Sequence, residues 1–318
     1  MKHPCILEVN ILSKSRRLGL MMIITGATLW GLTGPVIQWL FLETEINTID
    51  FLIVRLILAG LLLLAFLYFR KQNIFTIWKH PSQWIQLLLF AFIGMLGAQY
   101  TFIETVRISN AVTATLFQFL GPVLIVVYMA IQYKKLPTFI QVLSIIIALS
   151  GIFFLITNGS FENIILTKIA IIFGVLTAIG FTFYTIQPAQ LIKSWGSPLI
   201  VGWGMLLAGL AILLFNRQFS IQTFTSTLTI DTTTMLLLAI LSGTISFVLY
   251  IGSLKHLSAM ETSLLSSIEP LVAVIISITW LNESFGGFQL IGGVFIVIAV
   301  VALSLPEKEL RTVTVERA

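Results

Sequence analysis

The sequence predicts an all-α integral membrane protein with ten transmembrane helices, arranged as two inverted five-helix repeats with both termini in the cytoplasm. Three observations support this prediction. The chain is dominated by long apolar segments, its basic residues gather on one side of the resulting topology, and its two halves align when one is shifted by 148 residues.

Composition assigns the chain to the membrane. It has 318 residues, of which 58% are hydrophobic and only 10% charged, and its mean hydropathy is +1.03. A soluble protein of this length keeps far more charge on its surface. The net charge of +5 comes from basic residues in short loops, which is a topology signal, so we expect no nucleic-acid partner. The single cysteine, Cys5, rules out an intrachain disulfide.

Ten segments are long and apolar enough to span a bilayer, which takes ~20 residues. They are 18–40, 48–69, 84–106, 110–132, 138–156, 167–190, 198–215, 233–254, 259–281 and 287–305. Segment 18–40 is too long for a cleavable signal and is expected to be retained. Residues 216–232, rich in Thr and Ser, are predicted to form a surface loop. Residues 1–17 and 306–318 are the expected cytoplasmic ends.

The basic residues orient the helices. With the amino terminus inside, the inner loops and ends hold Lys2, Lys14, Arg16, Arg17, Arg70, Lys71, Lys79, Lys134, Lys135, Lys193, Lys255, Lys308, Arg311 and Arg317. The outer loops hold only Arg107, Lys168 and Arg217, and Arg55 alone falls inside a span. This asymmetry follows the positive-inside rule and places both termini in the cytoplasm.

The 148-residue shift indicates an internal repeat. It aligns Gly26 with Gly174, Ala111 with Ala259, Pro122 with Pro270 and Gln141 with Gln289. The repeats are residues 18–156 and 166–305. Because five helices is an odd number, the second repeat enters the membrane upside down, as in many secondary transporters, whose substrate site lies near the midplane beside interrupted helices. Pro122 and Pro270 are predicted to be these interruptions, since proline kinks a helix interior.

Several segments then resemble a known family. They are SIEPLVAVIISITWLNES and QLIGGVFIVIAVVAL in the second repeat, and LWG at residues 29–31, VRLILAG around Arg55 and LGPVLIVV around Pro122 in the first. Their order over residues 18–305 resembles the EamA-type branch of the drug/metabolite transporter superfamily. The resemblance implies two inverted EamA repeats and secondary transport of small organic solutes, often outward. The second repeat carries Glu283 at the end of its kinked helix, as the family does, whereas the first has Lys135 there.

Glu269 precedes Pro270 inside an apolar run, where a carboxylate is costly unless something pairs with it. One interpretation is a proton-coupling carboxylate or cation partner facing a cavity. The other is a carboxylate that braces the kink by accepting hydrogen bonds from freed backbone donors or from Ser266 and Ser267.

Arg55 lies about a third of the way into its helix. It could hold an anion such as a substrate carboxylate with its guanidinium fork. It could equally form an internal ion pair with Glu104 or Glu269.

Polar and aromatic side chains recur in six of the predicted helices. They include Trp30, Gln99, Tyr100, Gln118, Tyr184, Gln187, Ser246 and Tyr250. Each could hydrogen-bond between helices, but as a set they indicate an amphipathic cavity. The nearly aliphatic helices 138–156 and 287–305 are expected at the periphery.

We therefore expect an exporter of amino acids or amphipathic drug-like solutes that works by alternating access, with protons as a second possible ligand. The alternatives are a facilitative importer or uniporter, a channel, or a lipid-modifying membrane enzyme. An enzyme is disfavoured because no HExxH, acidic cluster, phosphate loop or mid-membrane histidine is found, and we expect no metal or cofactor. The expected location is the cytoplasmic membrane of a bacterium, as a monomer or homodimer.

Overall fold

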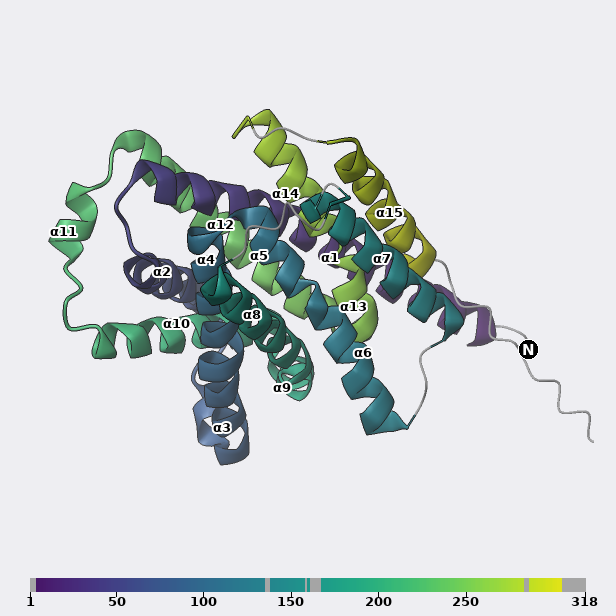
Figure 1. The fold of residues 1–318 in the computed structure, drawn as a ribbon. Helices are drawn as coiled ribbons and strands as arrows, with labels where there is room; N and C mark the ends of the chain where they lie inside the picture. Colours follow the sequence, from purple (N-terminus) through teal and green to yellow (C-terminus); the bar gives the residue numbers. More distant parts are fainter. Residues whose placement is uncertain (1–3, 135–137, 158, 161–166, 283–285, 305–318) are drawn as a thin grey trace, which may run out of the picture.

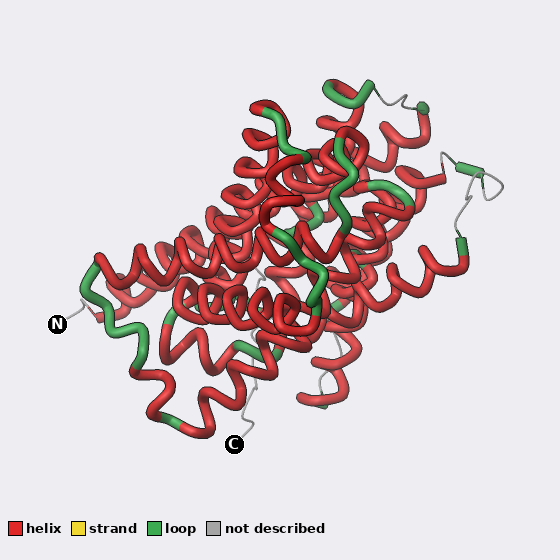
Figure 2. The backbone as a smooth tube through the Cα atoms, turned by 90° about the vertical axis from the view of Figure 1, so that its left-hand side faces the viewer, coloured by secondary structure: helices red, strands yellow, loops and turns green. Residues whose placement is uncertain are grey.

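The chain folds into a bundle of helices. The computed structural model describes residues 4–134, 138–157, 159–160, 167–282 and 286–304. Figure 2 shows helices joined by short loops, and no strand occurs in these ranges. In chain order the elements are α1 (Pro4–Glu43), α2 (Thr48–Phe69), η1 (Thr76–Lys79), α3 (Pro81–Leu89), η2 (Phe90–Leu96), α4 (Gly97–Ile108), α5 (Ala111–Gln118), α6 (Leu120–Tyr133), α7 (Phe139–Thr157), α8 (Lys168–Ile186), α9 (Ala189–Trp195), α10 (Ser197–Phe215), α11 (Ile221–Ser226), α12 (Ile230–Ser253), α13 (Ala259–Leu265), α14 (Ile268–Thr279) and α15 (Gly287–Ser304).

Within the described ranges, seven helical stretches are long and apolar enough to cross a membrane. They are 15–43, 48–69, 81–108, 168–186, 197–215, 230–253 and 261–279. Together they make the chain an all-α, multi-pass membrane protein. The stretch 81–108 runs through α3, η2 and α4, and η2 is a π-helical segment inside it. Such segments are rare and often occur at functional sites.

Side-chain capping explains where several helices begin. The Ser258 hydroxyl accepts a hydrogen bond from the Glu261 backbone N–H, and the Glu261 carboxylate accepts one from the Ser258 backbone. Thr229 and Thr232 form the same reciprocal box at the start of α12. The predicted loop 216–232 is therefore partly wrong, because it contains the short helix α11, capped by Ser220. Each cap satisfies backbone donors that a helix start leaves unpaired.

Near both prolines the helix is interrupted by one or two residues of turn, across which helix-like backbone hydrogen bonds continue. Span 110–132 divides into α5 and α6, and span 259–281 divides into α13 and α14. Each proline is the third residue of the second helix, because Pro122 follows Leu120 and Pro270 follows Ile268. In the first turn a backbone N–H has no partner within the helix, so proline is tolerated there.

The break positions repeat along the chain. Helix α5 begins at Ala111 and helix α13 begins at Ala259, 148 residues later. The starts of α6 and α14 are also 148 residues apart, and so are those of α7 and α15. The sequence shift thus reappears in the helix boundaries.

Helices from the two halves pack against one another. Helix α1 packs on α12 and α14, α2 on α10, and α4 on α8. Helices α7 and α15 lie side by side along one edge of the bundle (Figure 1). A Cβ at Gly31 would lie 2.5 Å from the Glu269 carbonyl oxygen, so glycine permits the close approach of α1 to α14.

Candidate functional site

A cavity lies among α1, α2, α4, α5, α8, α12 and α14. Its wall is formed by Trp30, Thr33, Gly34, Ile37, Arg55, Ala98, Gln99, Phe102, Ile103, Gln118, Phe181, Tyr184, Phe247 and Glu269. Six of these were expected from the sequence: Trp30, Arg55, Gln99, Gln118, Tyr184 and Glu269. Helices distant in sequence thus bring one basic, one acidic and several aromatic side chains to the same cavity.

Glu269 reaches across the bundle to the other broken helix. Its side chain is only 2% exposed, and its two carboxylate oxygens accept hydrogen bonds from Gln118 Nε2 at 3.3 and 3.1 Å. Gln118 is the last residue of α5, and Glu269 lies in the first turn of α14. The bond therefore joins the two breaks.

The expectation that nearby serines brace this carboxylate is wrong. The Ser266 hydroxyl donates to the Ser263 carbonyl at 2.7 Å, and the Ser267 hydroxyl donates to the Leu264 carbonyl at 2.5 Å. Hydroxyls commonly bond backbone carbonyls one turn earlier in this way. Both serine hydroxyls therefore bond backbone carbonyls of their own chain segment and not the carboxylate of Glu269. The Glu269 side chain lies in the cavity wall.

The first repeat has no acidic residue at the equivalent break. The 148-residue shift places Gly121 opposite Glu269. A Cβ on Gly121 would overlap the Phe181 ring, with Cε1 only 3.2 Å away. Close packing at this point excludes any side chain, so the two breaks are chemically different.

Arg55 is a buried cation without an acidic partner among the described residues. It is 4% exposed, its Nε has no acceptor, and its guanidinium lies 5.8 Å from the centre of the Phe51 ring. The expected internal ion pair is wrong, because Glu104 instead pairs with Arg107 and accepts a hydrogen bond from Thr48 at 2.6 Å. A buried charge of this kind is costly unless a ligand or water compensates it.

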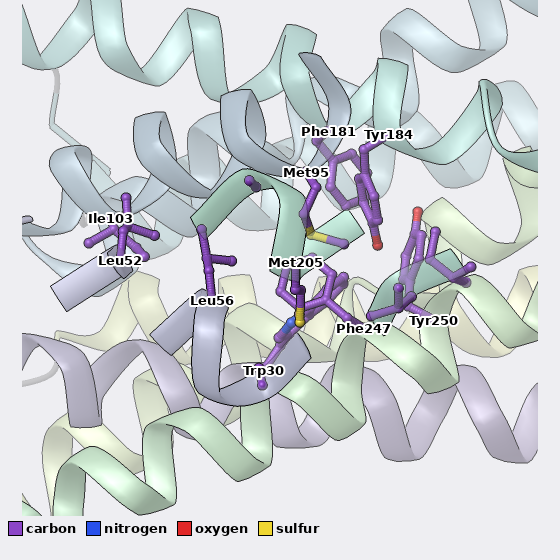
Figure 3. Packing of buried hydrophobic residues seen from close by; sticks show 14 of the residues in the cluster. Trp30, Leu52, Leu56, Met95, Ile103, Phe181, Tyr184, Met205, Phe247 and Tyr250 are labelled. Atoms are coloured by element: carbon purple, nitrogen blue, oxygen red, sulfur yellow. The ribbon is translucent and has the colours of Figure 1, made fainter. Parts of the chain in front are cut away.

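Aromatic rings form part of the cavity wall. Trp30 from α1 packs against Phe247 and Tyr250 from α12, with ring centres 4.9 and 5.0 Å apart, and Tyr184 from α8 stacks on Tyr250 at 5.4 Å (Figure 3). The Tyr184 hydroxyl and Gln99 Oε1 are buried without partners. These atoms, like Arg55 Nε, are unsatisfied polar groups in the cavity wall, as expected of a site that binds solvent or solute.

Four expected side chains lie outside this wall. Tyr250 packs on the wall residues Trp30 and Tyr184, and its hydroxyl hydrogen-bonds that of Thr185 at 3.0 Å. Ser246 donates to the Ser242 carbonyl at 2.7 Å, and Gln187 donates to the Gln86 carbonyl at 2.9 Å. Tyr100 borders a separate polar basin with Asp50, Glu104 and Arg107.

Eight residues of the cavity wall were not predicted from the sequence. They are Thr33, Gly34, Ile37, Ala98, Phe102, Ile103, Phe181 and Phe247. Most are apolar, and in a chain with 24 Phe an apolar side chain facing a cavity has no signal that separates it from one facing lipid. Glu283 and Lys135, the departure from the family pattern, lie outside the described residues.

Comparisons with known proteins agree with this architecture. The sequence profile of the EamA-like transporter family matches residues 17–157 and 168–305. The chain is 30% identical over 294 residues to a Salmonella typhimurium protein named "Uncharacterized inner membrane transporter YicL", covering 92% of this chain and 97% of that one. It is 24% identical over 226 residues to "Uncharacterized transporter YyaM" of Bacillus subtilis, covering 69% and 73%.

A solved crystal structure shares the fold. It superposes with a TM-score of 0.72 at 14% identity, covering 90% of this chain and 96% of that one. Two matched family regions and a relative aligned over nearly its whole length show the family. The chain therefore belongs to the EamA-like transporter family, and it is a membrane transporter rather than an enzyme.

Proposed function

We propose that the protein is a secondary transporter that exports amino acids or similar amphipathic solutes by alternating access. The chain is proposed to cross the cytoplasmic membrane ten times, with both termini inside and the second repeat inverted. The repeated helix boundaries and the basic inner loops support this topology. The name of the Salmonella relative, which places that protein in the inner membrane, supports the location.

The observation that carries the solute class is the pair of buried charges in one cavity. Arg55 has no acidic partner among the described residues, and Glu269 is held only by the neutral amide of Gln118. An amino acid would place its carboxylate on the guanidinium and its ammonium on Glu269. Its apolar part would face Trp30, Phe102 and Phe247. A zwitterion with an apolar side chain satisfies both charges at once.

Proton coupling is the second part of the proposal. Glu269 can exchange its Gln118 hydrogen bonds for a bound proton or for a substrate ammonium group. A carboxylate that carries a proton in one half of the cycle would link solute movement to the proton gradient. If the carboxylate stays charged throughout, the protein is a facilitative uniporter, which is the alternative candidate.

The test is solute flux in proteoliposomes with an imposed pH gradient. A mixture of amino acids and amphipathic metabolites is loaded, its movement is measured by mass spectrometry, and wild type is compared with Glu269→Gln. We expect an amino acid to move with the gradient in wild type and to lose its dependence on pH in the variant. Flux in wild type that does not respond to the pH gradient would favour the uniporter, and equal pH dependence in both proteins would remove Glu269 from proton coupling. The absence of any flux under either gradient direction would contradict the transport proposal.

A further inference from the structure

Gly243 of α12 lies directly against the Arg55 guanidinium. A Cβ at this position would lie well inside van der Waals contact of Nη2 and 3.2 Å from Cζ. The guanidinium therefore rests on bare backbone. Helical positions that require glycine for this reason mark a close approach that any side chain would prevent.

Packing rather than ion pairing fixes where this guanidinium lies. Its Nε has no hydrogen-bond partner, no described acidic side chain pairs with it, and its Cζ lies 5.8 Å from the centre of the Phe51 ring. A group held by shape alone moves when the shape changes. The size of the side chain at position 243 therefore determines how closely the guanidinium can approach helix α12.

Helix α12 cannot readily move back to make room. Next to Gly243, the Ser242 hydroxyl hydrogen-bonds the Thr33 hydroxyl of α1 at 2.7 Å, and a Cβ at 243 would also meet the Thr33 methyl at 3.5 Å. These contacts hold α12 against α1. An added methyl would therefore displace the flexible end of Arg55 and leave the helices in place.

We propose that Gly243 is a positioning residue that sets recognition of a substrate carboxylate by seating Arg55. This inference rests on the proposed function, because it assigns Arg55 to the carboxylate of an amino acid. In Gly243→Ala the guanidinium moves into the cavity and loses its bidentate alignment, since fork geometry tolerates little displacement. The ammonium partner Glu269 is unaffected.

The experiment compares a substrate with the same molecule lacking its carboxyl group. Transport of leucine and of 3-methylbutylamine is measured in proteoliposomes for wild type, Gly243→Ala and Gly97→Ala. Gly97 is the matched control, because a Cβ there meets only the Phe92 carbonyl at 3.9 Å. We expect Gly243→Ala to raise the KM for leucine about ten- to a hundredfold, as for a lost hydrogen bond to a charged group. The KM for the amine should stay near wild type.

A second pair of variants separates positioning from general damage. In the Arg55→Gln background, Gly243→Ala should have no further effect on the leucine KM, because the two residues act through one contact. If Gly243→Ala alone folds poorly, its folding is compared with that of the double variant, because the shorter glutamine side chain should relieve the overlap and restore folding. Poor folding of both variants would overturn the contact between Gly243 and Arg55.

The outcomes distinguish the two proposals. An equal rise in both KM values, or an effect of Gly243→Ala that persists without Arg55, would overturn the role of Gly243. A wild type that moves leucine no better than the amine would overturn the assignment of Arg55 to a carboxylate. In either case, flux of another solute in the assay with mixed metabolites would still support the proposal that the protein is a transporter.

Discussion

At the scale of single residues, the contact between Glu269 and Gln118 is the main polar link across the cavity. The carboxylate is buried, and Gln118 Nε2 is its donor. Its partner lies 151 residues away in the chain. This long-range contact makes the stability of one repeat depend on a side chain of the other.

Replacing Gln118 by leucine should therefore destabilise the protein. The apolar side chain removes the donor and leaves a buried carboxylate unsatisfied, which costs about 1–3 kcal/mol. The free energy of unfolding in detergent measures the effect. In the Glu269→Gln background the cost should be smaller, because a neutral amide is less expensive to leave unpaired. Equal costs in both backgrounds would show that the contact contributes no stability.

Arg55 should show the opposite relation between stability and function. It is a buried cation without a described acidic partner, so Arg55→Gln removes an expensive charge. We expect an increase of about 1 kcal/mol or more in the free energy of unfolding, together with loss of carboxylate recognition. Thermal unfolding measured beside leucine transport checks both. Lower stability would mean that ordered water already satisfies the guanidinium.

At the scale of elements, the start of α13 is held by two kinds of contact. The Glu261 carboxylate closes a capping box with Ser258 and forms an ion pair with Arg16 of α1. Ser15 of α1 also hydrogen-bonds the His256 ring at 2.9 Å. These polar contacts tie the first broken helix of the second repeat to α1.

The two contributions of Glu261 can be separated by substitution. Ser258→Ala removes the cap and should cost about 1 kcal/mol. Arg16→Ala removes only a partly exposed ion pair and should cost up to about 1 kcal/mol, less at high salt. Glu261→Ala removes the ion pair and the carboxylate half of the capping box, but it keeps the bond from its backbone N–H to the Ser258 hydroxyl. It should therefore cost more than Arg16→Ala in chemical denaturation. A smaller loss for Glu261→Ala than for Arg16→Ala would contradict this assignment.

At the scale of the whole molecule, the sequence predicted the class, the family resemblance and the 148-residue periodicity. These follow from composition and from chemically distinctive residues such as proline, whose positions can be compared between halves. The sequence predicted interruptions at Pro122 and Pro270, but it did not predict their form as short turns between two helices. A proline pattern indicates that a helix is interrupted, but the local hydrogen bonding of Phe119, or of Ser266 and Ser267, decides whether it bends or stops.

The cavity was predicted only through its polar members. Glu269, Arg55, Gln99 and Gln118 stand out in an apolar span, and the structure brings all four to one wall. Their partners could not be inferred. The partners of Arg55 and Glu269 depend on helix rotations, which periodicity in a uniformly apolar helix leaves undetermined. Gly243 was not predicted, because a sequence does not show which glycine leaves room for the side chain of a neighbouring helix.

The topology gives a prediction for the whole chain. In a Cys5→Ser background, Lys255→Cys should be protected from a membrane-impermeant thiol reagent added outside intact cells, and Gln218→Cys should react. In the proposed topology, which follows the positive-inside rule, Lys255 lies in the cytoplasm and Gln218 on the outer side. Permeabilised cells, in which both sites should react, provide the control. The reverse pattern of protection would invert the proposed orientation.

The packing of Gly121 against Phe181 has a consequence for stoichiometry. A duplicated fold could offer two matching acids, one per break, and so load two cations per turnover. Here the second position is filled by an aromatic ring, and only the break at Glu269 carries charge. A transporter built in this way would offer a cation one carboxylate rather than two beside its interrupted helices, whichever solute it carries.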